Sequence, residues 1–206
     1  MICGVPPTTE LSSFAQLLHF QWGTSSAEET VSLRREEDKR AAAIIGATPR
    51  HFNTPDCIYR RSKEGEPLYP LDVFDAPHPL EGGLDREIAR ELEAALLPDD
   101  ILVCPLGIGK HVDHVITRRA VESLGRETWY YADIPYLLKH PEELPPATHG
   151  MRGELHSIPE ESLTAWQDGI AAYGSQIKML FETDESMRTQ ISGYCQSSRG
   201  VFLWRS

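Results

Sequence analysis

The sequence predicts an α/β fold with a parallel sheet and helices on both of its faces. Short apolar or aromatic runs with the length of strands alternate with longer stretches of helical spacing. Such alternation is typical of parallel sheets, because each parallel connection needs a crossover, usually a helix. The expected order is helix 27–46, strand 54–60, helix 84–97, strand 101–104, helix 115–124 and strand 128–136.

Composition and charge exclude several classes of protein. The chain has 206 residues, 40% of them hydrophobic, so it can bury a core, and we expect one domain, 1–206. The net charge of -11 argues against nucleic acid as a partner, since phosphate binding needs a basic face. No apolar run reaches the roughly 18 to 20 residues of a membrane span, so we expect no membrane partner. The cysteines show no CxxC spacing, which favours a reduced, cytoplasmic protein; they are Cys3, Cys57, Cys104 and Cys195.

The first third of the chain is expected to be helix and loop. Residues 8–26 are interpreted as a long loop with a short helix, in which His19 and Trp22 either line a pocket or, as we favour, pack the loop down. The helix 27–46 should end at Gly46. Its charged residues indicate a solvent-exposed face with local pairs at helical spacing, and they are Arg34, Arg35, Glu36, Glu37, Asp38, Lys39 and Arg40.

The middle of the chain leads into the central strand. Residues 54–60 are expected to form a short strand with Asp56 at its start, and the breaker-rich span 62–79 a loop. After the helix 84–97, Pro98-Asp99-Asp100 turns the chain into the apolar strand 101–104.

A glycine-rich stretch follows that strand, Pro105-Leu106-Gly107-Ile108-Gly109-Lys110-His111-Val112-Asp113-His114. Ligands in open α/β sheets bind at the carboxyl ends of strands. Residues three apart on a helix share a face, so His111 and His114 can converge while Asp113 hydrogen-bonds a ring N–H. The pattern predicts half of a metal site or an acid–base group, and an ordinary helix cap is the alternative.

An aromatic strand, 128–136, should end beside these histidines. Asp133 and Tyr136 at its end either contribute to a pocket rim or form a turn fixed by Pro135. Beyond it we expect a proline-rich loop (139–153), a strand (154–158), one long helix (160–181), and a last helix with a short apolar end (185–204).

The stretch 109–115 resembles the second signature, H-x-D-H after a strand, of the LmbE-like or PIG-L family of zinc-dependent N-acetylglucosamine-type deacetylases. Arg35-x-x-Asp38 before an apolar run that ends at Gly46 resembles the family's R-x-x-E helix. Asp56 resembles a substrate-side aspartate, and 131–136 resembles the aromatic strand of many members.

This resemblance implies a three-layer, Rossmann-like fold with a mostly parallel sheet. It also implies that zinc-activated water removes an N-acetyl or other N-acyl group from an amino sugar or glycoconjugate. His114 would be a zinc ligand, His111 would stabilise the oxyanion or pass a proton, and Asp113 would orient a histidine. Arg35 and Asp56 would bind the substrate.

The family's first signature, H-P-D-D-E, has only partial matches, at His78-Pro79 and at Pro98-Asp99-Asp100. Met1-Ile2-Cys3-Gly4 resembles the end of the family's second strand, so we expect about 30 to 45 residues, an N-terminal strand and helix, to be missing from the start. Only one of the three usual protein ligands would then remain, and zinc binding should be weak.

Two other functions stay open. The first is a catalytically impaired or non-catalytic carbohydrate-binding remnant of the same fold, which keeps the pocket without the metal chemistry. The second is a metal-free hydrolase or transferase with His111 as general base, which is less favoured because the sequence has no G-x-S-x-G motif.

Overall fold

The structure, a computed structural model, describes residues 6 and 10–206, and its chain forms two compact units. The first unit comprises Met1–Arg60 and Ser157–Val201, and the second comprises Arg61–His156 and Phe202–Ser206. The expected strand end at Met1-Ile2-Cys3-Gly4 lies outside the described residues. The single domain 1–206 stays a prediction.

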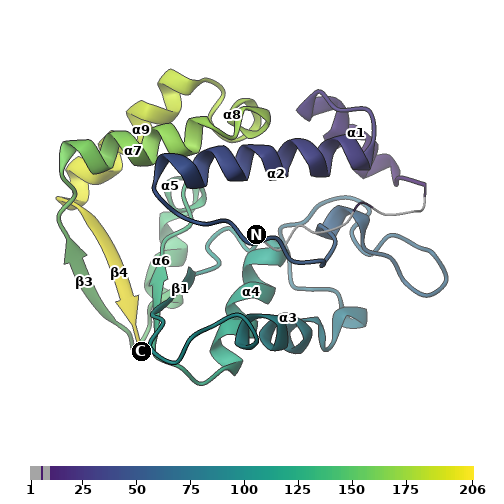
Figure 1. Ribbon diagram of the computed structural model, residues 1–206, viewed down its shortest axis with the longest axis horizontal. Coiled ribbons are helices and arrows are strands. Elements are labelled where there is room, and N and C mark those ends of the chain that lie inside the picture. The colour runs from purple at the N-terminus through teal and green to yellow at the C-terminus, as the bar shows by residue number, and fades with distance from the viewer. Residues whose placement is uncertain (1–5, 7–9) are drawn as a thin grey trace. The chain divides into compact units, whose positions relative to one another are not determined.

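The described part of the first unit is helical. Ser12, Ser26 and Thr183 each accept an N–H from the first turn of the helix that follows, which satisfies a main-chain donor that a helix start leaves open. Helix α2 lies along α7, and α9 packs against α7 and α8 (Figure 1). The elements are α1 (Ser13–Trp22), α2 (Ala27–Ile44), the 3₁₀ turn η1 (Cys57–Tyr59), α7 (Glu160–Ala171), α8 (Gly174–Phe181) and α9 (Asp184–Ser198).

The second unit contains the sheet, in the order β1-β2-β4-β3. Strands β1 and β2 are parallel, β2 and β4 are antiparallel, and the arrows of β3 and β4 point in opposite directions (Figure 1). The α/β class is thus confirmed, but the sheet is mixed. The strands are β1 (Leu102–Pro105), β2 (Thr128–Tyr131), β3 (Arg152–His156) and β4 (Val201–Arg205), whose first residue belongs to the first unit.

Helix α4 connects the two parallel strands and packs against both β1 and α3. Its buried face comprises Val112, Ile116, Ala120 and Val121, whose spacing follows the helical repeat. The helical elements of this unit are η2 (Pro79–Glu81), α3 (Leu84–Glu93), α4 (Val112–Ser123), α5 (Tyr136–Lys139), η3 (Pro141–Glu143) and α6 (Leu144–Ala147).

The strand expected to be central lies instead at one end of the sheet formed by the described strands. Leu102 and Cys104 are buried, whereas Ile101 and Val103 are exposed. An unbroken apolar run predicts burial on both faces, but residues 101 to 104 alternate between exposed and buried, as the two-residue repeat of a strand requires, and Pro105 at the strand end is buried as well.

Three other expected elements are corrected. Residues 54–60 form no strand, because Asp56 accepts the main-chain N–H of Ile58 and starts the turn η1. The helix 160–181 is two helices, α7 and α8, which break at Tyr173. The segment 139–153 contains the short helices η3 and α6 and the start of β3, because proline is tolerated in the first turn of a helix.

The charged face of α2 is only partly exposed. Glu36 and Lys39 form the expected surface pair, at 2.7 Å. Glu37, in contrast, is 2% exposed and accepts hydrogen bonds from the main chain and the hydroxyl of Ser175, at 2.8 and 2.7 Å. Asp38, three residues after Arg35 and so at the spacing of a local pair, accepts instead from His51 and Tyr173. These partners come from distant segments, so helical spacing alone could not predict them.

Candidate active site

The turn between β1 and α4 is shaped by its glycines. Gly107 and Gly109 have φ angles of 78° and 79°, in the left-handed region that glycine adopts without strain. A Cβ atom on Gly109 would lie 2.7 Å from the side chain of Tyr136, so no other residue fits there without displacing that ring. The close approach brings the start of α5 against the turn that precedes α4.

His111 caps α4, as the predicted alternative of a helix cap requires. Its Nδ1 accepts the main-chain N–H of Asp113 at 3.2 Å. A ring nitrogen that accepts carries no proton, so a neutral His111 holds its proton on Nε2. His111 is therefore a hydrogen-bond donor at its outer nitrogen, and the main chain of Asp113 fixes that orientation.

His114 has the opposite arrangement. Its Nδ1 lies 2.6 Å from Oδ1 of Asp133. An ionised carboxylate only accepts, so Nδ1 carries the proton and Nε2 keeps its lone pair. The His114 side chain is 36% exposed and that of Asp133 is 1% exposed. The structure confirms that the end of the aromatic strand lies beside the histidines.

Aromatic rings surround the two histidines. The ring centroids of His111 and His114 are 5.1 Å apart, and Phe74 lies 5.5 Å from His111. Tyr136 lies 5.6 Å from Phe74 and 6.0 Å from His114. Sequence reasoning missed Phe74, because it lies in an irregular loop that a main-chain bond between Val112 and Val73, at 2.9 Å, holds to the helix start.

Cys104 precedes this turn but supplies no thiolate. The thiol is buried in β1, and burial raises its pKa to about 12. A protonated thiol neither attacks a substrate nor ligates a metal well. The chemistry of this unit therefore depends on the two histidines and their partners.

Arg35 and Asp56 lie in the first unit, whereas His111, Asp113 and His114 come together in the second. Arg35 is half-buried on α2, and among the described residues its buried Nε has no hydrogen-bond partner. Asp56 caps η1 and accepts from Ile58 N–H at 3.2 Å. The substrate-binding role of both residues stays a prediction.

His78, in the partial match to the first signature, has a local structural role. It precedes η2, and its Nδ1 accepts the main-chain N–H of Leu80 at 3.2 Å. This contact is a helix-cap contact, so the partial match at His78-Pro79 needs no metal-binding role to account for it.

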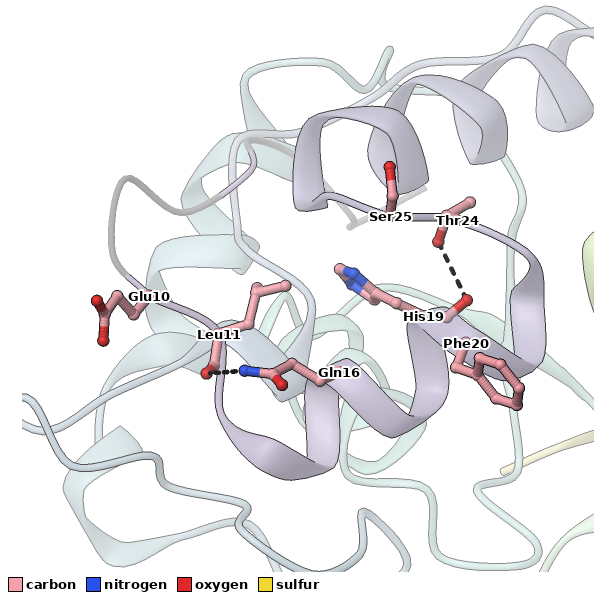
Figure 2. Close-up of a pocket in the computed structure, with 7 residues that line it drawn as sticks. All are labelled: Glu10, Leu11, Gln16, His19, Phe20, Thr24 and Ser25. Carbon is pink, nitrogen blue, oxygen red and sulfur yellow. Dashed lines mark hydrogen bonds between the residues drawn. The ribbon is translucent and has the colours of Figure 1, made fainter.

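A shallow hollow of about 650 Å³ lies beside α1 in the first unit (Figure 2). His19 lines it and also packs inward, with its Nε2 2.7 Å from the hydroxyl of Tyr59. Both alternatives considered for His19 therefore apply. Trp22 packs under the guanidinium of Arg34, 4.4 Å from the ring centroid. The residues that line the hollow are Glu10, Leu11, Gln16, His19, Phe20, Thr24 and Ser25.

Among the described residues, no helix combines the length and apolar character that a membrane crossing would require. No protein-family model matches the chain, and no curated protein sequence matches it.

Solved structures of deacetylases match the chain over its whole length. The zinc-inhibited form of teicoplanin deacetylase Orf2 has a TM-score of 0.82 and 21% identity, covering 100% of this chain and 86% of that one. A deacetylase–teicoplanin complex has a TM-score of 0.80 and 21% identity, with coverages of 100% and 84%. The A40926 pseudoaglycone deacetylase Dbv21 has a TM-score of 0.74 and 21% identity, with coverages of 99% and 81%. The chain has the fold of these deacetylases.

Proposed function

We propose that the chain is a metal-dependent N-deacetylase that hydrolyses the N-acyl group of an amino sugar or glycoconjugate. The observation that carries this proposal is the pair of histidines on one helix turn with opposite proton positions. His114 offers a lone pair at Nε2, and His111 offers an N–H at Nε2. Amide hydrolysis at a metal needs both a ligand and a donor for the oxyanion.

The residues present fit one part of a zinc site. A histidine ligand of zinc typically donates its other ring N–H to a carboxylate, as His114 does to Asp133. His114 would therefore hold the metal, which, when bound, would lower the pKa of a water molecule and supply the nucleophile. One structural neighbour, a zinc-inhibited deacetylase, supports a metal in this fold.

His111 would act on the amide during the reaction. Its Nε2–H points away from the bond to Asp113 and can donate to the carbonyl oxygen as that oxygen becomes negative. As the C–N bond breaks, the leaving nitrogen takes one proton of the attacking water, the acyl carbon keeps the oxygen of that water, and the second proton goes to solvent, while the neutral His111 keeps its own proton. The products are a carboxylate and a free amine. Asp113 would orient His111 in this role.

The substrate proposal follows from the surroundings. Phe74 and Tyr136 offer aromatic faces beside His111 and His114, which suit the C–H faces of a sugar ring. The family resemblance also assigns Arg35 and Asp56 to substrate binding, and that role stays a prediction. One structural neighbour is a deacetylase–teicoplanin complex. A cytoplasmic location is supported by the buried, unoxidised thiols of Cys104 and Cys195.

The experiment measures acetate and free amine released from an N-acetylglucosamine glycoside by the chain with Zn²⁺. We expect release that stops after chelation and returns when zinc is added. His140→Ala is the control, because the His140 side chain is exposed and pairs with Glu142, while its main-chain bond to Tyr136 is kept by alanine, so the change should leave release unaltered. Release that survives chelation would contradict metal dependence. Saturable sugar binding without release would favour the non-catalytic alternative.

A further inference from the structure

The carboxylate of Asp133 contacts two separate elements of the site. Its Oδ1 accepts from Nδ1 of His114 at 2.6 Å, and its Oδ2 accepts the main-chain N–H of Ile108 at 3.0 Å. The side chain is 1% exposed, and Ile108 is fully buried. A buried carboxylate is stable only when donors satisfy its oxygens, and here the two oxygens have one donor each.

The register of the sheet brings Asp133 to this place. The parallel pairing of β1 with β2 aligns Pro105 with Tyr131, and Leu106 N–H donates to Tyr131 O at 2.9 Å. Beyond the strand ends, Ile108 follows Pro105 by three residues and Asp133 follows Tyr131 by two, and the hydrogen bond from Ile108 N–H to Asp133 joins them. The pairing of two adjacent parallel strands therefore places a carboxylate between the glycine-rich turn and α4.

We propose that Asp133 is the positioning residue of the site, which holds His114 in the Nδ1–H form and fixes the turn before His111. This inference deepens the proposed function, on which its metal-binding consequence rests. The proton on Nδ1 leaves the Nε2 lone pair of His114 available to a metal. The same carboxylate accepts from the main chain of Ile108, so the orientation of the His114 ring depends on the position of the glycine-rich turn.

Glu143 provides a matched comparison. Its Oε2 accepts the N–H of Gly109, the next residue of the same turn, at 2.8 Å. Its other oxygen lies 3.8 Å from Nζ of Lys110. Glu143 thus stabilises the turn as Asp133 does, but the contacts described for it do not include His114. The two carboxylates separate an effect on the turn from an effect on the histidine.

The variant Asp133→Asn makes a sharp test, because an amide has one acceptor and one donor where the carboxylate has two acceptors. The amide oxygen should stay on the buried N–H of Ile108, since an unsatisfied buried donor is costly. The NH₂ group would then face His114 and require its Nδ1 to accept. The proton of His114 should move to Nε2, and the lone pair for a metal should be lost.

The experiment uses the full chain, free of metal and labelled with ¹⁵N-histidine, and reads ring protonation from two-bond ¹H–¹⁵N spectra. We expect the Nδ1–H form of His114 in the wild type and in Glu143→Gln, and the Nε2–H form in Asp133→Asn. Titration with Zn²⁺ alone should then show affinity about 10 to 100-fold lower for Asp133→Asn, and unchanged for Glu143→Gln.

An Nδ1–H form of His114 in Asp133→Asn, with unchanged zinc affinity, would overturn the inference. If Asp133→Asn does not fold, the wild-type spectrum tests the inference. An Nε2–H form of His114 in the wild type would overturn the inference, and an Nδ1–H form would support it. Failure of the proposed function is a separate result. It would appear as wild-type protein that releases no acetate while the spectra still show the expected forms.

Discussion

Two histidine–aspartate pairs in this chain have nearly the same length and different surroundings. His114 and Asp133 are 2.6 Å apart in the second unit, and His51 and Asp38 are 2.7 Å apart in the first. In the first unit both side chains are similarly covered, 14% and 17% exposed. The other oxygen of Asp38 accepts from the hydroxyl of Tyr173, so the pair links α2 to the break before α8.

The pair in the second unit is asymmetric. Its carboxylate is buried, while 36% of the His114 side chain is exposed. A buried carboxylate fixes the ring, and the exposed side of the ring remains open to a ligand or substrate. A histidine–aspartate hydrogen bond therefore has a structural role in the first unit and a positioning role in the second. The exposure of the histidine ring distinguishes the candidate ligand from the structural contact.

The largest effect on zinc binding and acetate release should appear when the histidine of each pair is replaced by alanine. His114→Ala should remove zinc binding and reduce acetate release to background, since the proposed ligand is lost. His51→Ala should leave both unchanged and lower the free energy of unfolding by about 1 to 3 kcal/mol, because Asp38 loses a partly buried partner. Metal analysis after dialysis and urea unfolding would separate the two. Zinc loss in His51→Ala, but not in His114→Ala, would reverse our assignment of the pairs.

The second-largest effect should distinguish the role of His111 from that of His114. His111→Ala should keep zinc, because its outer nitrogen is a donor, and should lower kcat about 10² to 10³-fold through loss of an oxyanion donor. Steady-state kinetics with bound zinc measured in parallel would check this. Loss of the metal in His111→Ala would mean that it, rather than His114, is the ligand.

How far sequence predicts such a site depends on how local its interactions are. The strand, glycine turn and helix that carry His111 and His114 are consecutive, so spacing alone placed them together. The nearness of Asp133 also followed from the expectation that two parallel strands end at the same edge. The sequence analysis, however, expected Asp113 to orient a histidine ring. The carboxylate that contacts His114 belongs to Asp133, twenty residues after Asp113.

Two errors fall where distant contacts override local patterns, and a third where a side chain bonds locally to the main chain. The break at Tyr173 inside the expected helix 160–181 coincides with its hydrogen bond to Asp38, which helical spacing cannot reveal. Glu37 is buried because Ser175 satisfies its carboxylate, although its neighbours indicate a solvated face. The strand expected at 54–60 is a capped turn, because Asp56 bonds locally to the main chain.

A smaller effect should follow from removing one hydroxyl of the structural pair. Burial and the hydrogen bond to Asp38 raise the pKa of Tyr173, so this phenol stays protonated and donates. Tyr173→Phe should lower the free energy of unfolding by about 0.5 to 1.5 kcal/mol, the usual net value of one hydrogen bond, and leave zinc binding unchanged. Urea unfolding would measure it, with Tyr136→Phe as a comparison that changes a ring near His114 instead. A change in zinc affinity in Tyr173→Phe would show that the two pairs are not independent.

The smallest effect concerns His19, which has no carboxylate partner in the contacts described for it and is 2% exposed. Burial lowers its pKa, partly offset by the charge of Asp56. The folded state therefore binds fewer protons than the unfolded state below the ordinary histidine pKa of about 6.5, and stability should be complete above that pH and decrease as the pH falls through it. The slope from one group cannot exceed about 1.4 kcal/mol per pH unit.

In His19→Gln, which keeps a polar group for Tyr59, the loss of stability between about pH 7.5 and 5.5 should be smaller than in the wild type, whereas the exposed His140→Ala should match the wild type. An equal loss in all three proteins would show that His19 is not buried in a neutral form.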